Sequence, residues 1–180
     1  MSGMYGDRMA AAARAATAAG APALVVTNPA NILYVSGFGG TSARLVLARG
    51  LLYFITDFRY SRSVAGLATA WPHGSQVIET TGGYDETLAS VVRDAEIQAL
   101  AFEAAHVSVG QHARWQRRLE GVALVPTEHV VESLRVVKDA AELDTLRKAG
   151  RRISAVAASL PEWVRSGRSA EICSVTVIEP

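Results

Sequence analysis

The sequence predicts an α/β fold, in which helices flank a mixed sheet of about six strands. Three observations lead to this prediction: short runs of apolar and β-branched residues recur along the chain, stretches of helical composition separate most of them, and turn residues bound them. An alternation of strands and helices is typical of layered folds with a partly parallel sheet. The chain of 180 residues is long enough for one ordinary domain that buries roughly 70% of its unfolded surface.

The expected strands are short and bounded by turn residues. They span residues 23–27, 45–48, 51–56, 76–79, 97–102 and 122–125. The first is bounded by Pro22 and Pro29, and Asn28 and Asn31 flank a turn directly after it. The second and third strands are joined through an Arg-Gly pair at residues 49–50, which predicts a hairpin.

The expected helices follow capping residues. They cover residues 9–19, a segment that begins near Arg59, and residues 84–94, 108–120 and 139 to about 160. The first is rich in Ala, the best helix former. Ser108 with Gln111, and Asp139 with Glu142, have the spacing of a capping box at a helix start. Pro161 is expected to end or bend the last helix.

Composition argues against several classes of function. The formal net charge of +1 provides no field that would attract nucleic acid or an anionic membrane, and no apolar run approaches the ~18 residues of a membrane span. Cys173 is the only cysteine, so it cannot form a disulfide within the chain, and the chain suits a reducing cytoplasm. We therefore expect a cytoplasmic protein with no nucleic-acid partner and no membrane partner.

The side chains that most often perform catalysis are not grouped in the sequence. The four histidines, His73, His106, His112 and His129, lack the spacing of a metal site, so surface or structural roles are favoured over metal binding. Cys173 would need a histidine base brought near by folding, and an unreactive thiol is the preferred interpretation. No catalytic residue, metal site or cofactor is therefore predicted in this chain.

Four carboxylates suggest a different hypothesis. The group of Asp57, Glu79, Asp85 and Glu103 could bind Mg²⁺ in the manner of a nuclease if three of its members converged on a mixed sheet. Asp57 and Glu103 do fall at the ends of expected strands. Helix capping, with Asp57 capping the helix near Arg59, and loop bracing explain both residues more simply.

Two segments carry the most specific pattern in the chain. Residues 28–38 read Asn-Pro-Ala-Asn-Ile-Leu-Tyr-Val-Ser-Gly-Phe, and residues 54–60 read Phe-Ile-Thr-Asp-Phe-Arg-Tyr. Together they resemble the opening domain of the creatinase, prolidase and Xaa-Pro aminopeptidase family, in which such a turn precedes a hairpin that ends in Ile-Thr-Asp-x-Arg-Tyr. The resemblance continues in order through residues 101–103, 125–126, 131–143 and 146–149, and it covers roughly residues 20–170.

The resemblance implies a division of the chain. Residues 1–137 would form a domain like the creatinase/prolidase N-terminal domain, which is ribonuclease H-like, and residues 138–180 a linker helix with the truncated start of a catalytic domain. Residues 173–180 are β-branched and strand-like where the family continues with a helix, which suggests a truncation, a frame change or an engineered end.

The resemblance also implies roles for particular residues. The family positions expected to be structural are Asn31, Tyr34, Gly37, Phe38, Asp57, Arg59, Tyr60, Glu103, Arg135, Lys138 and Glu142. Arg44 lies near the position from which creatinase-like dimers lend an arginine to the partner subunit, where it contacts the substrate carboxylate. An arginine at the start of an edge strand facing water is the alternative interpretation of Arg44.

By this resemblance, the chain is the non-catalytic N-terminal domain of a metal-dependent Xaa-Pro peptidase, where it serves dimerisation and closure of the substrate cleft. In the family, the catalytic domain binds two divalent metal ions through two Asp, one His and two Glu. No such set follows the linker helix here, so the chain alone is expected to be inactive. It is expected to form a homodimer, and a proline-containing peptide would bind only the full-length parent.

An alternative is a stand-alone peptide- or protein-binding module derived from such a peptidase. The choice between a dipeptidase, an aminopeptidase and a creatinase-like parent depends mainly on the catalytic half, so this sequence leaves it open.

Overall fold

The computed structural model describes residues 3–163, and the chain divides into two units, Met1–Val136 and Val137–Pro180. The described elements, in chain order, are α1 (Met4–Ala18), β1 (Ala23–Val26), α2 (Pro29–Ser36), β2 (Ala43–Ala48), β3 (Leu51–Thr56), α3 (Ser61–Ala68), β4 (Gln76–Glu79), α4 (Tyr84–Asp94), β5 (Ala99–Glu103), α5 (Val109–Arg118), β6 (Ala123–Thr127), α6 (Val130–Val136) and α7 (Ala140–Trp163). The strand expected at residues 173–180 lies outside the described residues, as does Cys173.

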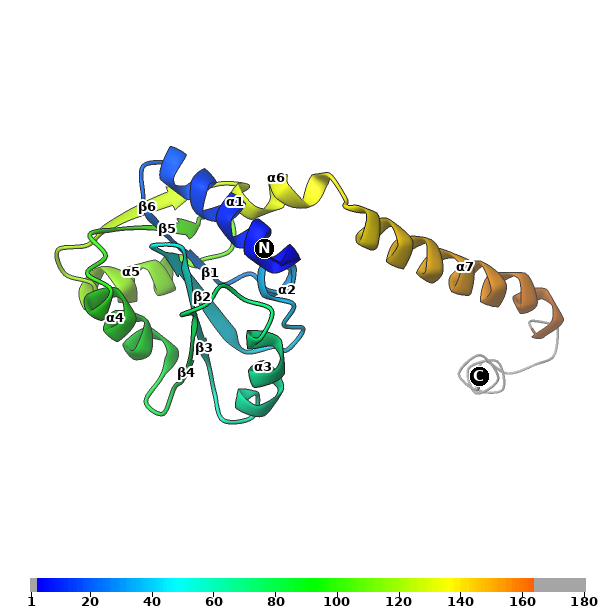
Figure 1. Ribbon diagram of the computed structural model, residues 1–180, viewed down its shortest axis with the longest axis horizontal. Helices are drawn as coiled ribbons and strands as arrows, with labels where there is room; N and C mark the ends of the chain where they lie inside the picture. The colour runs from blue at the N-terminus through cyan, green and yellow to red at the C-terminus, as the bar shows by residue number, and fades with distance from the viewer. Residues whose placement is uncertain (1–2, 164–180) are drawn as a thin grey trace. The chain divides into compact units, whose positions relative to one another are not determined.

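The strands form one mixed sheet of six strands in the order β4-β3-β2-β1-β5-β6 (Figure 1), which confirms the predicted fold class. β2 pairs antiparallel with β1 and β3, and all other neighbouring strands pair in parallel. It follows that β2 alone runs against the rest of this sheet. Five strands therefore end at the edge where β2 begins, and we call it the carboxyl edge.

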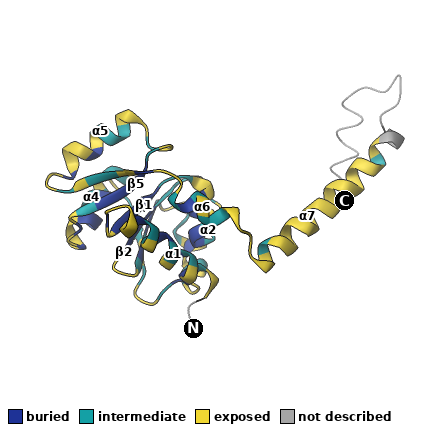
Figure 2. Cartoon of the chain, turned by 90° about the horizontal axis from the view of Figure 1, so that it is seen from above, coloured by how far each residue is buried: buried dark blue, intermediate teal, exposed yellow. Residues whose placement is uncertain are grey.

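Helices cover both faces of the sheet, and buried residues are concentrated in the strands between them (Figure 2). On one face α1, α2, α3 and α6 pack against side chains such as Leu24 and Phe54. On the other face α4 and α5 pack against side chains such as Val25 and Phe102. Because successive strand residues enter opposite cores, the inner strands read as continuous apolar runs and not as alternating patterns.

Residues 29–36 form the helix α2, so the turn predicted there was wrong. Asn28 caps this helix, since its Oδ1 accepts a hydrogen bond from the backbone N–H of Ala30 at 3.0 Å, and Pro29 occupies the first helical position. Gly37 ends it with a φ of 81°, a left-handed conformation that suits glycine. A helix of 8 residues is marginal by itself, and burial of its apolar face stabilises it here.

Three helix ends differ from the prediction. α1 begins at Met4, ahead of the Ala-rich stretch that was expected to start it at residue 9. α3 begins at Ser61 after Tyr60, which makes no side-chain cap, so Asp57 does not cap this helix. α7 continues to Trp163, past Pro161, which was expected to end or bend it near residue 160. A proline close to a helix end removes only one intrahelical hydrogen bond, which limits its effect.

Of the two capping boxes, one is complete. At the start of α7, the backbone N–H of Glu142 donates to Asp139 Oδ1 at 2.8 Å, and that of Asp139 donates to Glu142 Oε2 at 3.0 Å. At α5, Ser108 accepts from the backbone N–H of Gln111 at 3.2 Å, but the Gln111 side chain turns away to Asp85. That side chain joins α5 to α4 instead of closing the box.

Candidate functional site

The carboxyl edge gathers most of the residues that the sequence singled out. Asn28 and Asn31 follow β1, Asp57 follows β3, Glu103 ends β5, and Arg44 stands near the start of the oppositely directed β2. These residues are far apart in the sequence, and the direction of the strands brings them to one end of the sheet. They form three polar clusters, centred on Glu103, Asp57 and Asp85.

Glu103 is the centre of a buried hydrogen-bond network, and only 6% of its surface is exposed. Its Oε2 accepts from the backbone N–H of Thr27 at 2.6 Å and from that of Asn28 at 2.8 Å. The Thr27 hydroxyl donates to the same oxygen, and Oε1 accepts from Asn31 Nδ2 at 2.7 Å. The carboxylate thus accepts the hydrogen bonds that water would otherwise accept from donors at the end of β1. These bonds compensate for the burial of its charge.

Asn31 extends this network to α6. Its Nδ2 also donates to Glu132 Oε1, and its Oδ1 accepts from Arg135 NH1 at 2.8 Å. The Tyr34 hydroxyl donates to the backbone oxygen of Leu134 at 3.2 Å. Four of the residues expected to be structural, Asn31, Tyr34, Glu103 and Arg135, therefore fix α6, the last helix of the first unit.

Asp57 braces the turn between β3 and α3. Its Oδ1 accepts from Arg59 Nε at 2.9 Å, and its Oδ2 accepts from Arg59 NH2 at 2.8 Å and from the Tyr84 hydroxyl at 2.9 Å. The hydrogen bonds from Arg59, followed by the one from Tyr84, hold the pKa of Asp57 well below its usual range, and the pKa of Arg59 is raised in turn. Burial and the Asp57 carboxylate raise the pKa of Tyr84.

The neighbouring aromatic residues close the same turn. The Tyr60 hydroxyl lies 2.9 Å from the hydroxyl of Thr41, a contact that lowers the pKa of Tyr60. The rings of Phe38 and Tyr60 meet edge to face with centroids 5.2 Å apart. Phe38 is 3% exposed and belongs to the core.

Asp85, at the start of α4, holds Arg44. It accepts hydrogen bonds from Arg44 NH1, from Trp115 Nε1 at 2.8 Å, from Arg114 Nε at 3.0 Å and from Gln111 Nε2 at 3.3 Å. Burial raises the pKa of Asp85, but the hydrogen bonds from Trp115, Arg114 and Arg44 outweigh it and leave the pKa lowered. The Arg44 side chain is only 15% exposed.

Arg44 also lines a polar hollow of about 260 Å³ at the carboxyl edge. The other lining residues are Thr27, Thr41, Ser42, Ala43, Tyr84, His106 and Gln111. Since β2 lies inside the sheet, the alternative interpretation of Arg44 as an edge-strand residue facing water was wrong. Its side chain is ordered by Asp85 at the wall of the hollow.

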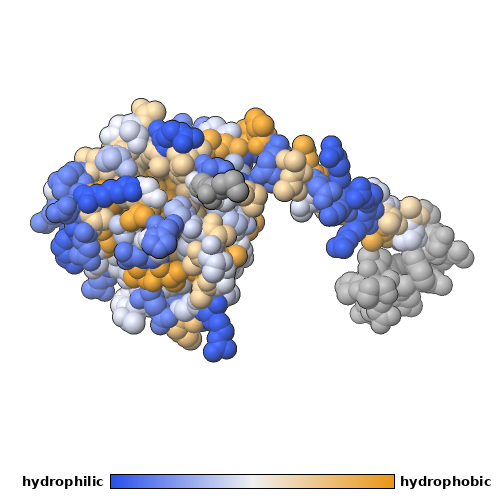
Figure 3. Space-filling model, viewed as in Figure 1, coloured by the Kyte–Doolittle hydropathy of each residue, from blue (hydrophilic) through white to orange (hydrophobic). Residues whose placement is uncertain are grey.

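Exposed apolar side chains accompany the polar clusters. Leu33 in α2, Phe58 after β3 and Val109 at the start of α5 are 50%, 76% and 86% exposed. All three belong to segments that follow strands at the carboxyl edge. The face of the molecule drawn in Figure 3 carries both hydrophilic and apolar areas.

The carboxylates do not assemble into the arrangement that a nuclease needs. Asp57, Asp85 and Glu103 are each held by separate donors, and Glu79 accepts a hydrogen bond from the Ser61 hydroxyl. Among residues 3–163, no group of three His, Cys, Asp or Glu side chains could hold a metal ion. The nuclease hypothesis therefore lacks the convergence on which it depended.

The remaining sequence candidates have local surroundings. His112 packs its ring against Phe102, with centroids 5.1 Å apart. His106 and His129 line a small cavity of about 60 Å³ beside Glu103. Lys138 lies between α6 and α7. Sequence reasoning did not select Glu132 or Trp115 as site residues, although Glu132 lies inside the segment 131–143 that carries the resemblance.

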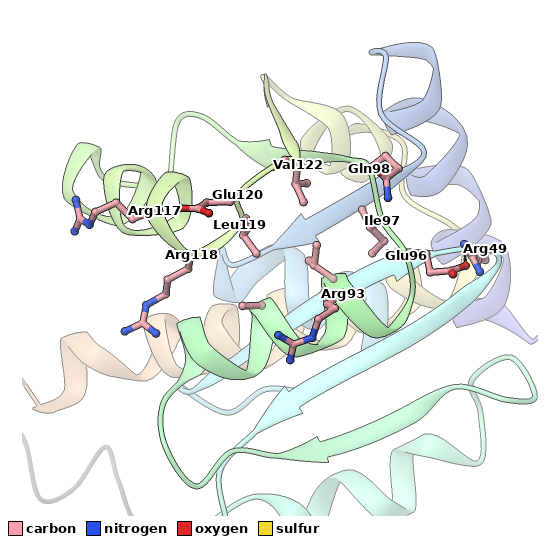
Figure 4. Close-up of a pocket in the computed structure, with 13 residues that line it drawn as sticks. Arg49, Arg93, Glu96, Ile97, Gln98, Arg117, Arg118, Leu119, Glu120 and Val122 are labelled. Carbon is pink, nitrogen blue, oxygen red and sulfur yellow. Dashed lines mark hydrogen bonds and ion pairs between the residues drawn. The ribbon is translucent and has the colours of Figure 1, made fainter.

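A second, wider hollow of about 890 Å³ lies at the opposite edge of the sheet (Figure 4). Its polar lining includes Arg49, Arg93, Arg117 and Arg118 together with Glu96 and Glu120. Arg93, Arg117 and Arg118 stand in the last turns of α4 and α5, where cations complement the helix dipole. The arrangement explains these charges without a ligand.

Comparison with known proteins identifies a matching family model and similar proteins. A family model described as the creatinase/prolidase N-terminal domain matches residues 8–137. An uncharacterized peptidase of Bacillus subtilis (strain 168), YqhT, is 30% identical over 132 residues, which are 73% of this chain and 36% of that protein. The chain thus spans about a third of that curated relative.

Solved structures show the same architecture. The Xaa-Pro dipeptidase from Bacillus anthracis superposes with a TM-score of 0.84 at 24% identity, covering 95% of this chain and 47% of that one. The N-terminal domain of the cytoplasmic peptidase PepQ from Mycobacterium tuberculosis H37Rv, at 26% identity and a TM-score of 0.62, covers 74% of this chain and is itself covered to 99%. No helix within residues 3–163 is both long and apolar enough to span a membrane.

Proposed function

The chain belongs to the creatinase/prolidase N-terminal domain family, and we propose that it acts as the non-catalytic N-terminal domain of a metal-dependent Xaa-Pro peptidase, a dipeptidase or an aminopeptidase. Relatives with those names support the substrate class: the dipeptidase from Bacillus anthracis and an Xaa-Pro aminopeptidase from Streptococcus pyogenes, which is 31% identical over 74% of this chain with a TM-score of 0.61. The similarity to PepQ, a cytoplasmic peptidase, supports a cytoplasmic location for this chain as well.

The chain's own contribution is dimerisation and closure of a substrate cleft. The observation that carries this proposal is the carboxyl edge, where the Arg44 hollow of about 260 Å³ adjoins segments that bear exposed apolar residues. Such a surface can cover a cleft and exclude water from it, which helps to position a substrate. Exposed apolar residues of α7, among them Leu146 and Ile153, add surface for association of two copies.

The two divalent metals of the proposed peptidase would lie in its catalytic part. The described residues of this chain offer no fitting donor set, and the carboxylates at the carboxyl edge are occupied by hydrogen bonds. When bound in the catalytic part, the metals would supply a nucleophilic hydroxide and polarise the scissile carbonyl. The residues of this chain would act by orienting the substrate.

Arg44 is the residue proposed to contact the substrate carboxylate across the dimer. Asp85 holds one of its nitrogens, and a guanidinium ordered in this way loses less conformational entropy when it binds a carboxylate. The proposed contact is charge-assisted. Its removal is expected to lower kcat/KM of the full-length peptidase about tenfold to hundredfold.

The test replaces Arg44 by Ala in the full-length peptidase and compares an Xaa-Pro substrate with its amidated form. The loss should shrink on the amidated substrate, because the contact is already absent there. Arg114→Ala is the matched control, since Arg114 also donates to Asp85 but does not line the hollow. Unchanged kinetics of Arg44→Ala, or an equal loss on both substrates, would contradict a role in carboxylate recognition.

A stand-alone binding module is the second candidate. The matched solved chain of PepQ is an N-terminal domain, which supports independent folding of the first unit. If this chain bound proline-containing peptides by itself with measurable affinity, for example in calorimetric titration, and if Arg44→Ala abolished that binding, the module would be favoured over the peptidase domain.

A further inference from the structure

We propose that two copies of this chain pair through β4, joining their sheets edge to edge in an antiparallel, two-fold arrangement. The inference rests on the proposed dimerisation and adds to it a specific contact between the two copies. The two edge strands of the sheet, β6 and β4, differ in whether their outward backbone groups can pair with a further strand.

The edge at β6 is protected. The backbone N–H of Ala123 donates to the Gln98 oxygen at 2.9 Å, so the backbone of Ala123 faces β5. Because the N–H and C=O groups of successive strand residues point to alternate sides, Leu124 and Pro126 face outward. Pro126 has no N–H to offer, and a proline in an edge strand is a common means of preventing further strand pairing.

The edge at β4 has no such protection. The backbone N–H of Thr80 donates to the Thr56 oxygen at 2.8 Å, so Thr80 faces β3, and by alternation Ile78 does too. Val77 and Glu79 therefore direct their N–H and C=O groups away from the sheet. β4 pairs only with β3 in the described part of the chain, which leaves these four groups available to a further strand.

The side chains favour a second copy as that strand. Pairing around a two-fold axis brings the same strand to itself in antiparallel direction, and only outward-facing residues can exchange hydrogen bonds. Three registers satisfy this condition and also use the outward groups of both Val77 and Glu79, and they are centred on Val77, Ile78 or Glu79. A register centred on Glu79 sets two like charges opposite each other, which is destabilising.

The remaining two registers differ in the donors that they can use. A register centred on Val77 pairs Ser75 with Glu79 of the second copy, but the Ser75 N–H already donates to the Pro72 oxygen at 3.1 Å. In the register centred on Ile78, Val77 of each copy pairs with Glu79 of the other copy. The outward N–H and C=O groups of Val77 and Glu79 are then all hydrogen-bonded in both strands. This register also sets the two Ile78 side chains against each other, each partly buried against the core on the α4 and α5 face of the sheet. The structure therefore favours the Ile78-centred register.

The test measures amide exchange in the full chain by NMR, below and above the concentration at which sedimentation detects a dimer. The amides of Val77 and Glu79 should exchange more slowly in the dimer than in the monomer. The amide of Ile78, which is bonded within the sheet, should be protected in both and serves as an internal reference.

Val77→Pro removes one outward donor from each copy without touching the ladder to β3. It should raise the Kd of the dimer about tenfold or more, whereas Val77→Thr, which keeps the N–H, should change it little. Circular dichroism and protection of the Ile78 amide verify that both variants are folded.

Three outcomes would overturn the inference, each in a different way. A two-fold dimer in which Val77 and Glu79 exchange at the monomer rate would reject β4 as the surface while keeping dimerisation. Assemblies larger than a dimer with protected amides would reject the two-fold register. A monomer at every concentration would reject both the inference and the dimerisation part of the proposed function.

Discussion

Glu103 shows how one buried charge is stabilised by the surrounding backbone. The carboxylate accepts four hydrogen bonds, from Thr27 N–H and hydroxyl, from Asn28 N–H and from Asn31 Nδ2. Both of its oxygens must therefore be acceptors. The network joins the end of β1 to β5 and, through Asn31, to α6.

Glu103→Gln should lower the free energy of unfolding by about 2–4 kcal/mol, although the side chain keeps its size. A glutamine offers one acceptor oxygen, and its NH₂ group would face either the Asn31 Nδ2 donor or the two backbone donors. Urea unfolding followed by circular dichroism measures the effect. Glu79→Gln, at an exposed carboxylate with one hydrogen bond, is the control and should change stability by less than about 0.5 kcal/mol. A cost equal to the control would mean that Glu103 is not a required acceptor.

The sequence identified Asn31, Tyr34, Glu103 and Arg135 only through their place in recurring segments. Asn31 and Arg135 are 104 residues apart, so their contact depends on how β1, β5 and α6 are placed and not on local preference. For the same reason the sequence offered no sign that Arg44 is held by Asp85 and Trp115. The sequence shows which polar residues lie at strand ends, but their hydrogen-bond partners cannot be predicted without the order of the strands.

At the scale of elements, prediction succeeded where periodicity or apolar runs are strong. The bounds predicted for β4 and α4 match those in the structure. The predicted hairpin is also present, and its turn residues Arg49 and Gly50 have φ values of 53° and 74°. The helices α2 and α6, of 8 and 7 residues, were missed, whereas α3, also of 8 residues, was expected after Asp57. Tertiary packing decides such short elements.

The two turn glycines allow a matched test of how α2 ends. Gly37 and Gly50 have similar φ values of 81° and 74°, but a Cβ on Gly37 would lie 2.6 Å from the Tyr5 hydroxyl oxygen, whereas one on Gly50 meets nothing within 4 Å. Gly50→Ala should cost about 1 kcal/mol from backbone strain alone, and Gly37→Ala about 2–3 kcal/mol. Chemical unfolding of both variants measures the difference. Equal costs would show that Tyr5 yields without penalty.

The turn between β3 and α3 should make stability dependent on acid. The pKa of Asp57 is lowered in the folded chain, so its contribution is present above the unfolded value near 3.9 and is lost as the pH falls below about 4. Stability should therefore fall more steeply with acid in the wild type than in Asp57→Asn. The dependence should not vanish in the variant, since the pKa of Asp85 is lowered too. Unfolding curves across this pH range that are parallel for both proteins would contradict the role of Asp57.

At the scale of the whole molecule, the mixed sheet with helices on both faces followed from the alternation of strands and helices. The expected division after residue 137 compares with units of Met1–Val136 and Val137–Pro180 in the structure. The carboxyl edge itself could not be foreseen, because it depends on the order of the strands and on which of them pair in parallel. The chain spans 36% of its Bacillus subtilis relative and 47% of the dipeptidase chain, so the activity of a whole peptidase remains a proposal.

In the proposed function, this chain contributes a covering and positioning surface and leaves the chemistry to a catalytic part. The most direct measurement incubates the purified chain with Xaa-Pro dipeptides and longer peptides, in the presence of Mn²⁺, Co²⁺ or Zn²⁺, and follows release of the products. We expect no hydrolysis above the rate of buffer with metal, because no group of side chains among residues 3–163 could hold the metal ions. Metal-stimulated hydrolysis that copurifies with this chain through successive columns would contradict it.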